Sequence, residues 1–216
     1  MKKLFVISGS SGVGKGTIIK RFLEKNPNFK LSVSCTTRGK RDGEEHGVNY
    51  YFLTREEFMS AVEKGEFLEW AEFSGNCYGT NKKFVQQCLD NDEDLLLEID
   101  TQGALQVKKK MDNAVLIFIL PPSVEELERR LRGRGTETEE AIQKRLNTVK
   151  SEMENAKFFN YKVINDEVDR AVEEIENIIK NEQVWFSKYY WKFCTTWITR
   201  KMGLFRLDCR NKSDWN

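Results

Sequence analysis

Histidine is almost absent from this chain, and its scarcity removes whole classes of chemistry. Among 216 residues there is one histidine, His46. A catalytic triad uses a histidine as its base, and many zinc sites use several imidazole ligands. We therefore set aside a histidine-based hydrolase and a multi-histidine metal centre as interpretations of this sequence.

Paired cysteines and long apolar runs are also missing. The five cysteines form no CxxC pair, which favours free thiols in a reducing compartment. No apolar run approaches the ~20 residues that cross a bilayer. The short stretch Leu4–Ile7 runs directly into Ser8-Gly9, which indicates a first strand and not a signal peptide. We expect a cytoplasmic protein.

A strong net charge is absent as well. The formal net charge is +1, with 39% hydrophobic and 32% charged residues. Such a balance is typical of a folded globular protein, and it gives the whole molecule no electrostatic attraction to nucleic acid. We expect no nucleic-acid partner.

Short apolar runs alternate with helical patterns along the chain. The runs are too apolar for strands with one solvated face, which indicates strands covered on both sides. Strands alternating with helices favour an α/β fold built on a parallel sheet. The five predicted strands are Leu4–Ile7, Leu31–Ser34, Leu95–Ile99, Val115–Leu120 and Tyr161–Ile164.

Two segments interrupt this alternation and predict inserted parts. Residues 36–78 contain the predicted strands Asn49–Leu53 and Glu66–Phe73 with the helix Arg55–Lys64 between them, and they indicate an inserted lobe. Residues 123–146 contain two helices, each with a capping box, joined through Gly133-Arg134-Gly135. The core domain then comprises 1–35, 79–122 and 147–184, and 185–216 form a basic, aromatic tail.

A glycine-rich loop between the first strand and the first helix carries the most informative motif. Glycine allows a tight turn and the close approach of backbone N–H groups to a polyphosphate at a helix N-terminus, and the lysine reaches the terminal phosphates. Gly16 occupies the position at which this type of loop usually carries a metal-binding Ser or Thr. The loop residues are Gly9, Ser10, Ser11, Gly12, Val13, Gly14, Lys15, Gly16 and Thr17.

Asp100 ends the buried run Leu95–Ile99, where such folds place an acid facing the nucleotide. An aspartate that only caps the strand end is the alternative. For Mg²⁺ carried with the nucleotide, Thr17 or Asp100 is the candidate ligand, directly or through water.

From about Lys3 to Glu182, the chain resembles the guanylate kinases, a family of P-loop nucleoside-monophosphate kinases. The resemblance rests on an ordered series of motifs. After the glycine loop they are Ser32–Arg38, Arg41, Gly43-Glu44, Gly47, Tyr50–Phe52, Phe67–Glu69, Tyr78–Thr80, Glu98–Asp100, Gln102–Ala104, Pro121–Ser123, Arg134–Glu139, Lys144–Leu146 and Asn165-Asp166.

The resemblance implies a P-loop NTPase-type five-stranded parallel sheet flanked by helices, with an inserted GMP-binding lobe and a helical lid. It implies transfer of the γ-phosphoryl group of ATP to GMP, with Mg²⁺. Lys15, Arg41, Arg134 and Arg145 would be catalytic. Arg130, Arg134 and Asn165 would join the glycine loop in binding ATP. The GMP-binding residues would be Ser34, Arg38, Arg41, Tyr50, Glu69, Tyr78, Thr80 and Asp100.

Two alternative functions, and the role of the tail, stay open at this point. The alternatives are a catalytically inactive interaction module of the same family and a kinase for another nucleoside monophosphate. Residues 185–216 would dock on their own domain, form an oligomer face or be an appendage with little structure. Contact of this basic aromatic tail with a membrane is the less favoured interpretation.

Overall fold

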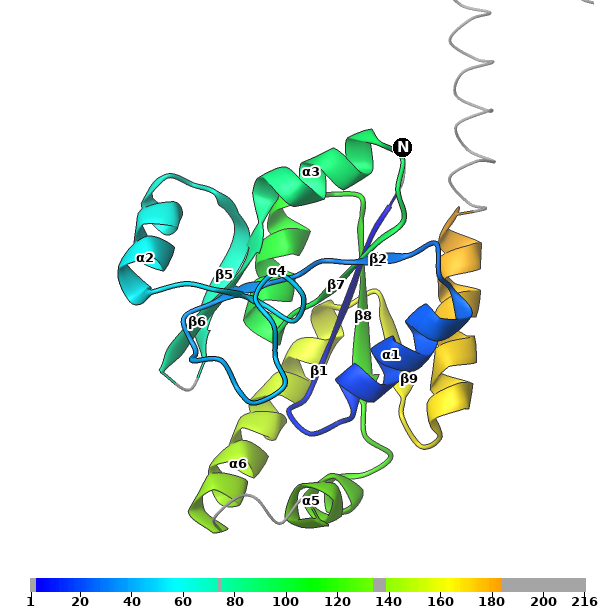
Figure 1. Cartoon of the computed structure of the whole chain (residues 1–216). Helices are drawn as coiled ribbons and strands as arrows, with labels where there is room; N and C mark the ends of the chain where they lie inside the picture. The colour runs from blue at the N-terminus through cyan, green and yellow to red at the C-terminus, as the bar shows by residue number, and fades with distance from the viewer. Residues whose placement is uncertain (1–2, 74, 134–138, 184–216) are drawn as a thin grey trace, which may run out of the picture. The chain divides into compact units, whose positions relative to one another are not determined.

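The computed structural model describes residues 3–73, 75–133 and 139–183, although several side chains within the helix that begins at Glu139 are not described (Figure 1). The chain divides into two compact units, Met1–Ile179 and Lys180–Asn216. The fold below is that of the first unit. The predicted tail at 185–216 lies outside the described residues.

A five-stranded sheet of parallel strands forms the centre of this unit. Its order is β2-β7-β1-β8-β9, with β1 (Leu4–Gly9) paired to β7 (Leu95–Glu98) and β8 (Ala114–Leu120). β2 (Lys30–Leu31) and β9 (Tyr161–Ile164) form the two edges. The predicted five-stranded parallel sheet is confirmed.

The strand β2 is shorter than the predicted run Leu31–Ser34. Ser32 N still donates to Leu96 O at 3.0 Å, but Ser34 O accepts from Tyr51 N at 2.9 Å. The chain therefore leaves the central sheet after Ser32 to join a second sheet. Sequence alone could not predict this change of partner, because Tyr51 lies well beyond the segment.

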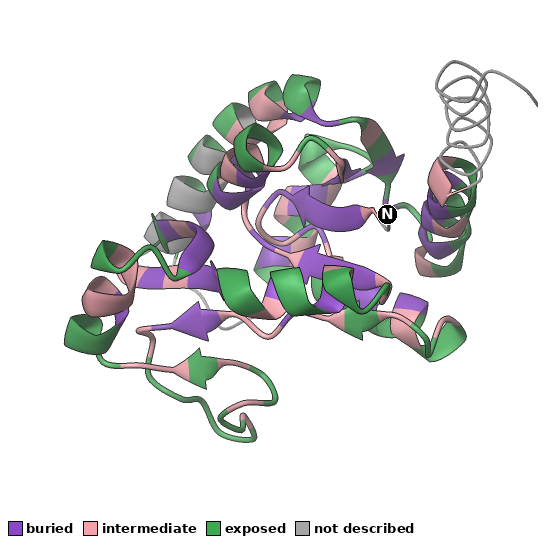
Figure 2. Ribbon diagram, turned by 90° about the horizontal axis from the view of Figure 1, so that it is seen from above, coloured by how far each residue is buried: buried purple, intermediate pink, exposed green. Residues whose placement is uncertain are grey.

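Helices cover both faces of the central sheet (Figure 1). Alternate side chains of β1 separate the two cores: Phe5 and Ile7 pack with α1 (Lys15–Lys25) and the helix at 168–183, whereas Leu4 and Val6 face the other side. That side is covered by α3 (Lys82–Asp90), α4 (Thr101–Lys110) and the 3₁₀ turn η1 (Ala156–Phe158). Figure 2 shows the sheet strands buried between helices whose outer surfaces are exposed.

A four-stranded sheet with the order β4-β3-β6-β5 forms the smaller layer. Its strands are β3 (Cys35–Thr36), β4 (Tyr51–Phe52), β5 (Phe67–Phe73) and β6 (Asn76–Asn81). β6 continues directly into α3, so the small sheet and the central domain are joined at a strand–helix junction.

The helix α2 (Arg55–Glu63) packs on this smaller sheet through the buried Phe58. Its predicted start is fixed by a capping box, in which Thr54 Oγ1 accepts from Glu57 N at 3.2 Å and Glu57 Oε2 accepts from Thr54 N at 2.8 Å.

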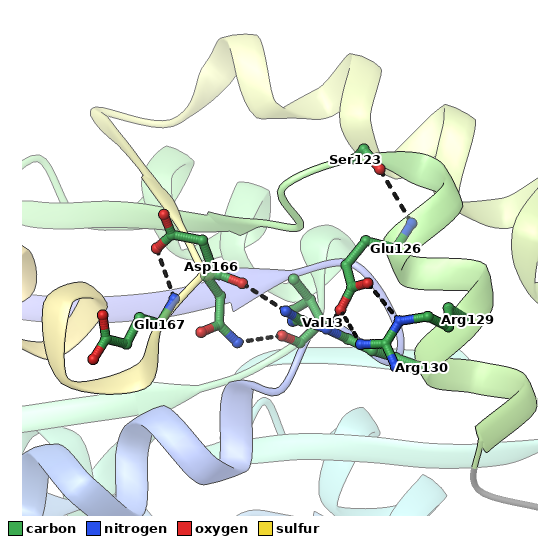
Figure 3. A network of polar contacts seen from close by, with 8 residues as sticks. Val13, Ser123, Glu126, Arg129, Arg130, Asp166 and Glu167 are labelled. Carbon is green, nitrogen blue, oxygen red and sulfur yellow. Dashed lines mark hydrogen bonds and ion pairs between the residues drawn. The ribbon is translucent and has the colours of Figure 1, made fainter.

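Two further helices follow β8: α5 (Val124–Gly133) and α6 (Glu139–Asn155). Ser123 Oγ accepts from Glu126 N at 3.1 Å, as the predicted cap requires (Figure 3). The second predicted capping box includes Thr136, which is outside the described residues. Within the described ranges, no helix is both long and apolar enough to cross a membrane.

Candidate active site

A cavity of about 300 Å³ brings the glycine loop together with the small sheet. Its lining combines the loop after β1, the carboxyl end of β7 and side chains of β5 and β6. In parallel α/β sheets, ligands bind at this carboxyl edge of the strands. The lining residues are Gly9, Ser11, Lys15, Leu31, Ser32, Ser34, Asn49, Tyr50, Glu69, Phe73, Tyr78, Gly79, Glu98, Ile99, Asp100 and Glu152.

Two glycines of the loop are required by its geometry. Gly12 and Gly14 have φ values of 86° and 93°, a region that side chains other than glycine rarely adopt. A Cβ on Gly14 would also lie 2.8 Å from Asn165 Nδ2. The loop can therefore turn into α1 with its backbone packed closely against neighbouring residues.

Lys15 is the charged residue of this loop and the first residue of α1. Its Nζ donates to Gly9 O at 2.6 Å and lines the cavity. Burial lowers the pKa of Lys15, and the nearby Glu98, Glu152 and Asp100 carboxylates oppose that shift. A half-buried cation whose partner is a carbonyl oxygen is ready to exchange that oxygen for a phosphate.

Glu152 is a cavity residue that the sequence did not predict. It projects from α6, and its Oε2 accepts from Ser11 N at 3.2 Å. Burial raises the pKa of Glu152, while the hydrogen bond from Ser11 opposes the shift. A carboxylate therefore lies against a backbone amide of the phosphate-binding loop. No local pattern marks Glu152, because only the packing of α6 brings it to the loop.

Glu69 is a buried acid that also lines the cavity. It is 3% exposed, and its Oε1 accepts from Thr80 Oγ1 at 2.6 Å. Burial raises the pKa of Glu69 to about 7, although the bond from Thr80 favours the ionised form. Although β5 is an edge strand, Glu69 is therefore not a solvent-exposed acid.

Asp100 combines a structural contact with a place in the cavity. Its Oδ1 accepts from Gly103 N at 2.8 Å, so Asp100 is the N-cap of α4. The acid nevertheless lines the cavity beside Lys15 and Glu98. Ser34, Tyr50 and Tyr78, which the sequence also predicts as site residues, are lining residues too.

The predicted phosphate-binding arginines lie in the loop before β4. Arg38 Nη2 donates to Glu44 Oε1 at 2.7 Å, and its guanidinium lies 5.3 Å from the centre of the Tyr50 ring. The Arg38 guanidinium, together with the Arg41 backbone N–H, holds the pKa of Glu44 below its ordinary value. Arg41 is exposed, and its N donates to Glu44 Oε2 at 2.9 Å. Arg38 thus lies beside Tyr50 at the cavity, whereas Arg41 lies outside the lining.

Asn165 and Arg130 brace the glycine loop. Asn165 Nδ2 donates to Val13 O at 2.7 Å. Arg130 Nη2 donates to Asn165 O at 3.1 Å, and its Nε donates to Glu126 Oε1 at 2.8 Å. Figure 3 shows Arg130 between Glu126 and the segment that follows β9. Asn165 contacts the loop directly, and Arg130 contacts Asn165. Neither residue lines the cavity.

Two predicted catalytic arginines cannot be placed. Arg134 is outside the described residues, and the side chain of Arg145 in α6 is not described. Lining residues without a predicted role include Ser32, whose buried Oγ has no hydrogen-bond partner among the described residues. Glu98 was recognised only as part of a motif; burial raises its pKa, and Lys15 opposes that shift.

Comparison with known proteins identifies the family. The family model described as "Guanylate kinase" matches residues 1–182. The chain belongs to the guanylate kinase family. A curated guanylate kinase of Caldanaerobacter subterraneus is 53% identical over 180 residues, covering 83% of this chain and 87% of that protein. One of Clostridioides difficile is 49% identical over 186 residues, covering 86% and 91%.

A solved guanylate kinase structure has the same fold. The crystal structure of guanylate kinase from Anaplasma phagocytophilum aligns with a TM-score of 0.70 and 36% identity, over 84% of this chain and 86% of that one. The family resemblance inferred from the motifs is therefore confirmed over nearly all of the chain before the tail.

Proposed function

We propose that this chain transfers the γ-phosphoryl group of ATP to GMP, giving ADP and GDP. The observation that carries the proposal is one cavity that is lined both by a phosphate-loop lysine, Lys15, and by a buried carboxylate, Glu69. A lysine and backbone amides suit a polyphosphate. A carboxylate suits a base with two adjacent donors.

The loop Gly9–Thr17 binds the ATP phosphates, and Lys15 neutralises the charge on the group being transferred. Asn165 and Arg130 hold the loop in place through the contacts with Val13 and Asn165 O. Arg134 and Arg145 add positive charge at the transfer step; their assignment rests on the family resemblance. Arginine forks are suited to the spread charge of a transferring phosphoryl group.

The small sheet and its preceding loop bind GMP. Arg38, Arg41, Tyr50 and Tyr78 hold the phosphate of GMP with charged and neutral donors. On the base, N1–H and the 2-amino group donate to Glu69. Ser34 and Thr80 supply hydroxyls to the rest of the base edge, with Asp100 nearby. Adenine has an unprotonated N1 at that edge, so it would leave the buried Glu69 carboxylate unsatisfied.

Mg²⁺ enters with ATP. Among the residues that the structure describes, no group of three or more His, Cys, Asp or Glu side chains could hold a metal ion. Mg²⁺ bound to a nucleotide needs only one or two carboxylates in addition to phosphate oxygens and water. Asp100 and Glu98 line the cavity and fit that requirement, whereas Thr17 is exposed and does not line it. The bound ion would neutralise phosphate charge.

The protein supplies alignment and a dry environment, without a covalent intermediate. It holds a phosphate oxygen of GMP in line with the γ-phosphorus and keeps water from taking the phosphoryl group. For this purpose residues 36–78 act as the GMP-binding lobe and 123–146 as a lid on the core domain. We place the reaction in the cytoplasm, where Cys35, Cys77 and Cys88 stay as free thiols.

A coupled assay with GMP, AMP and UMP as acceptors tests the function. We expect turnover with GMP and ATP and strong discrimination against the other two acceptors. Lys15→Met should lower kcat by about 10²-fold or more, because it removes a charge from the phosphate site. Lys20→Met is the matched control, since Lys20 is exposed on the same helix.

Three results would contradict the proposal. Equal turnover of AMP and GMP would remove the guanine assignment. Near-normal turnover by a folded Lys15→Met protein would remove the phosphate-loop mechanism. A wild-type protein that turns over no monophosphate at all would favour the interaction module.

A further inference from the structure

Helix α4 is bonded to the free edge of β5 on both sides of Glu69. The side chain of Gln106 donates to Trp70 O at 2.6 Å and accepts from Trp70 N at 3.3 Å. Lys110 Nζ donates to Leu68 O at 2.5 Å. Leu68 and Trp70 are the two neighbours of Glu69 in the strand. The helix is therefore anchored to the segment that carries the buried acid.

Gly103 is the residue of α4 that meets the Glu69 carboxylate. A Cβ added to Gly103 would lie 2.2 Å from Glu69 Oε2 and 2.9 Å from its Cδ. Non-bonded carbon and oxygen atoms need more than ~3 Å, so a methyl group there would displace the carboxylate by about 1 Å. Because Gln106 and Lys110 hold α4 in place, the carboxylate has to move rather than the helix.

The same glycine also holds the second acid of the cavity. Gly103 N donates to Asp100 Oδ1 at 2.8 Å. The backbone of Gly103 thus positions one carboxylate, and its missing side chain leaves room for the other. Glu69 is fixed from its other side by Thr80 Oγ1 at 2.6 Å.

We propose that Gly103 is a positioning residue for base recognition, which sets the place of the Glu69 carboxylate in the acceptor site. The inference rests on the proposed reading of guanine by Glu69. Gly103 acts through Glu69. Because a buried carboxylate displaced by about 1 Å can no longer accept both guanine donors well, GMP binding should weaken and discrimination against AMP should fall.

The first test compares Gly103→Ala with the wild type, using steady-state kinetics for GMP and AMP. We expect kcat/KM for GMP to fall by about 10²-fold, mainly through KM, with KM for ATP little changed. The ratio of GMP to AMP specificity should fall in parallel. Gly103→Ala with the wild-type KM for GMP and the wild-type specificity ratio would overturn the proposal.

A double variant tests the contact itself. Glu69→Asp withdraws the carboxylate by one methylene group, which makes room for the methyl group of alanine. We expect the double variant to have a higher kcat/KM for GMP than Gly103→Ala alone. The losses in kcat/KM from the two substitutions would then not be multiplicative. Fully multiplied losses would overturn the proposal. If Gly103→Ala does not fold, the double variant should restore folding, and failure of both to fold would also overturn it.

Two variants on the same helix separate positioning from general stability. Gln102→Ala removes an exposed side chain beside Gly103, and it should change neither the KM for GMP nor the ratio of GMP to AMP specificity. Ala104→Gly should lower Tm, because it weakens a buried helical position, while leaving the GMP to AMP ratio intact. A wild-type protein without GMP kinase activity would refute the proposed function. An active wild type with a normal Gly103→Ala variant would refute only this inference.

Discussion

Glu69 is buried, which favours its neutral form, whereas its proposed role requires the charged form. Its carboxylate is buried and accepts a hydrogen bond from Thr80, and burial raises its pKa to about 7. Reading guanine requires the ionised form, because only that form accepts from two donors. In the proposed recognition of guanine, the binding of GMP lowers the pKa of Glu69 and releases a proton from each molecule in which Glu69 was protonated before binding.

Acid should weaken GMP binding through Glu69. Since the pKa of Glu69 is raised to about 7, the protonated fraction of Glu69 grows as the pH falls through that value. The KM for GMP should therefore rise by about tenfold between about pH 8 and about pH 6. Calorimetry of GMP binding in two buffers near pH 7 measures the released proton.

The matched control for this pH dependence is Glu69→Gln. The GMP phosphate itself titrates with a pKa of about 6, and the amide variant reports that contribution alone. The variant should bind GMP more weakly and release fewer protons. If wild type and Glu69→Gln show the same pH dependence and the same proton release, Glu69 does not ionise on binding.

Single residues of the site differ in how far the sequence could predict them. Lys15 and the loop glycines could be recognised because strand, turn and helix adjoin in the chain. Glu69 needed the family resemblance, since Leu68 and Trp70 make the other face of its strand apolar as well. Glu152 and Gly103 take their roles from contacts with distant residues, Ser11 and Glu69, so no local pattern could reveal them.

Helix α6 places a carboxylate, that of Glu152, against the glycine loop in which we propose that ATP binds. The carboxylate accepts from Ser11 N at 3.2 Å and faces the region where Lys15 lies. An anionic ligand must share that amide with Glu152 or displace it. The helix therefore opposes the binding of phosphate at one point of a loop that otherwise favours it.

Glu152→Gln should lower the KM for ATP by about fivefold, because roughly 1 kcal/mol of repulsion from a charge near the triphosphate is removed. The amide oxygen can still accept from Ser11 N, so the loop keeps its contact. Steady-state kinetics with ATP as the varied substrate measure the change. Glu154→Gln is the control, as Glu154 is exposed on the same helix. An unchanged or higher KM for ATP would show that the Glu152 charge does not oppose the nucleotide.

At the same scale, the long apolar strands of the central sheet were predictable, whereas β3 and β6 of the small sheet were not. The central strands are apolar on both faces, and that pattern survives in the sequence. β3 comprises Cys35–Thr36 alone, and it exists because it pairs with Tyr51–Phe52 and with Tyr78–Gly79. Such a strand is defined by its partners, so sequence analysis assigned no strand to Cys35–Thr36 and described only the lobe around it.

In the whole molecule, the proposed site lies within the unit Met1–Ile179. Truncation after Gln183 keeps the described helix at 168–183 complete. We expect the truncated protein to retain most of its kcat and both KM values, because every proposed site residue precedes the cut. Kinetics of both proteins, with circular dichroism as the folding control, give the comparison. A folded but inactive truncated protein would place residues 184–216 in the working enzyme.

The parallel pairing of β1 also sets an order of events during synthesis. β1 precedes every other strand of its sheet in the chain, yet its sheet partners are β7 and β8. The amide that braces the phosphate loop belongs to Asn165. The chain must therefore emerge as far as β7 before β1 gains its first neighbour, and as far as β8 before it gains its second. Until then Leu4–Ile7 is an apolar strand segment without a partner, which is the kind of segment that exposes a partly made chain to aggregation.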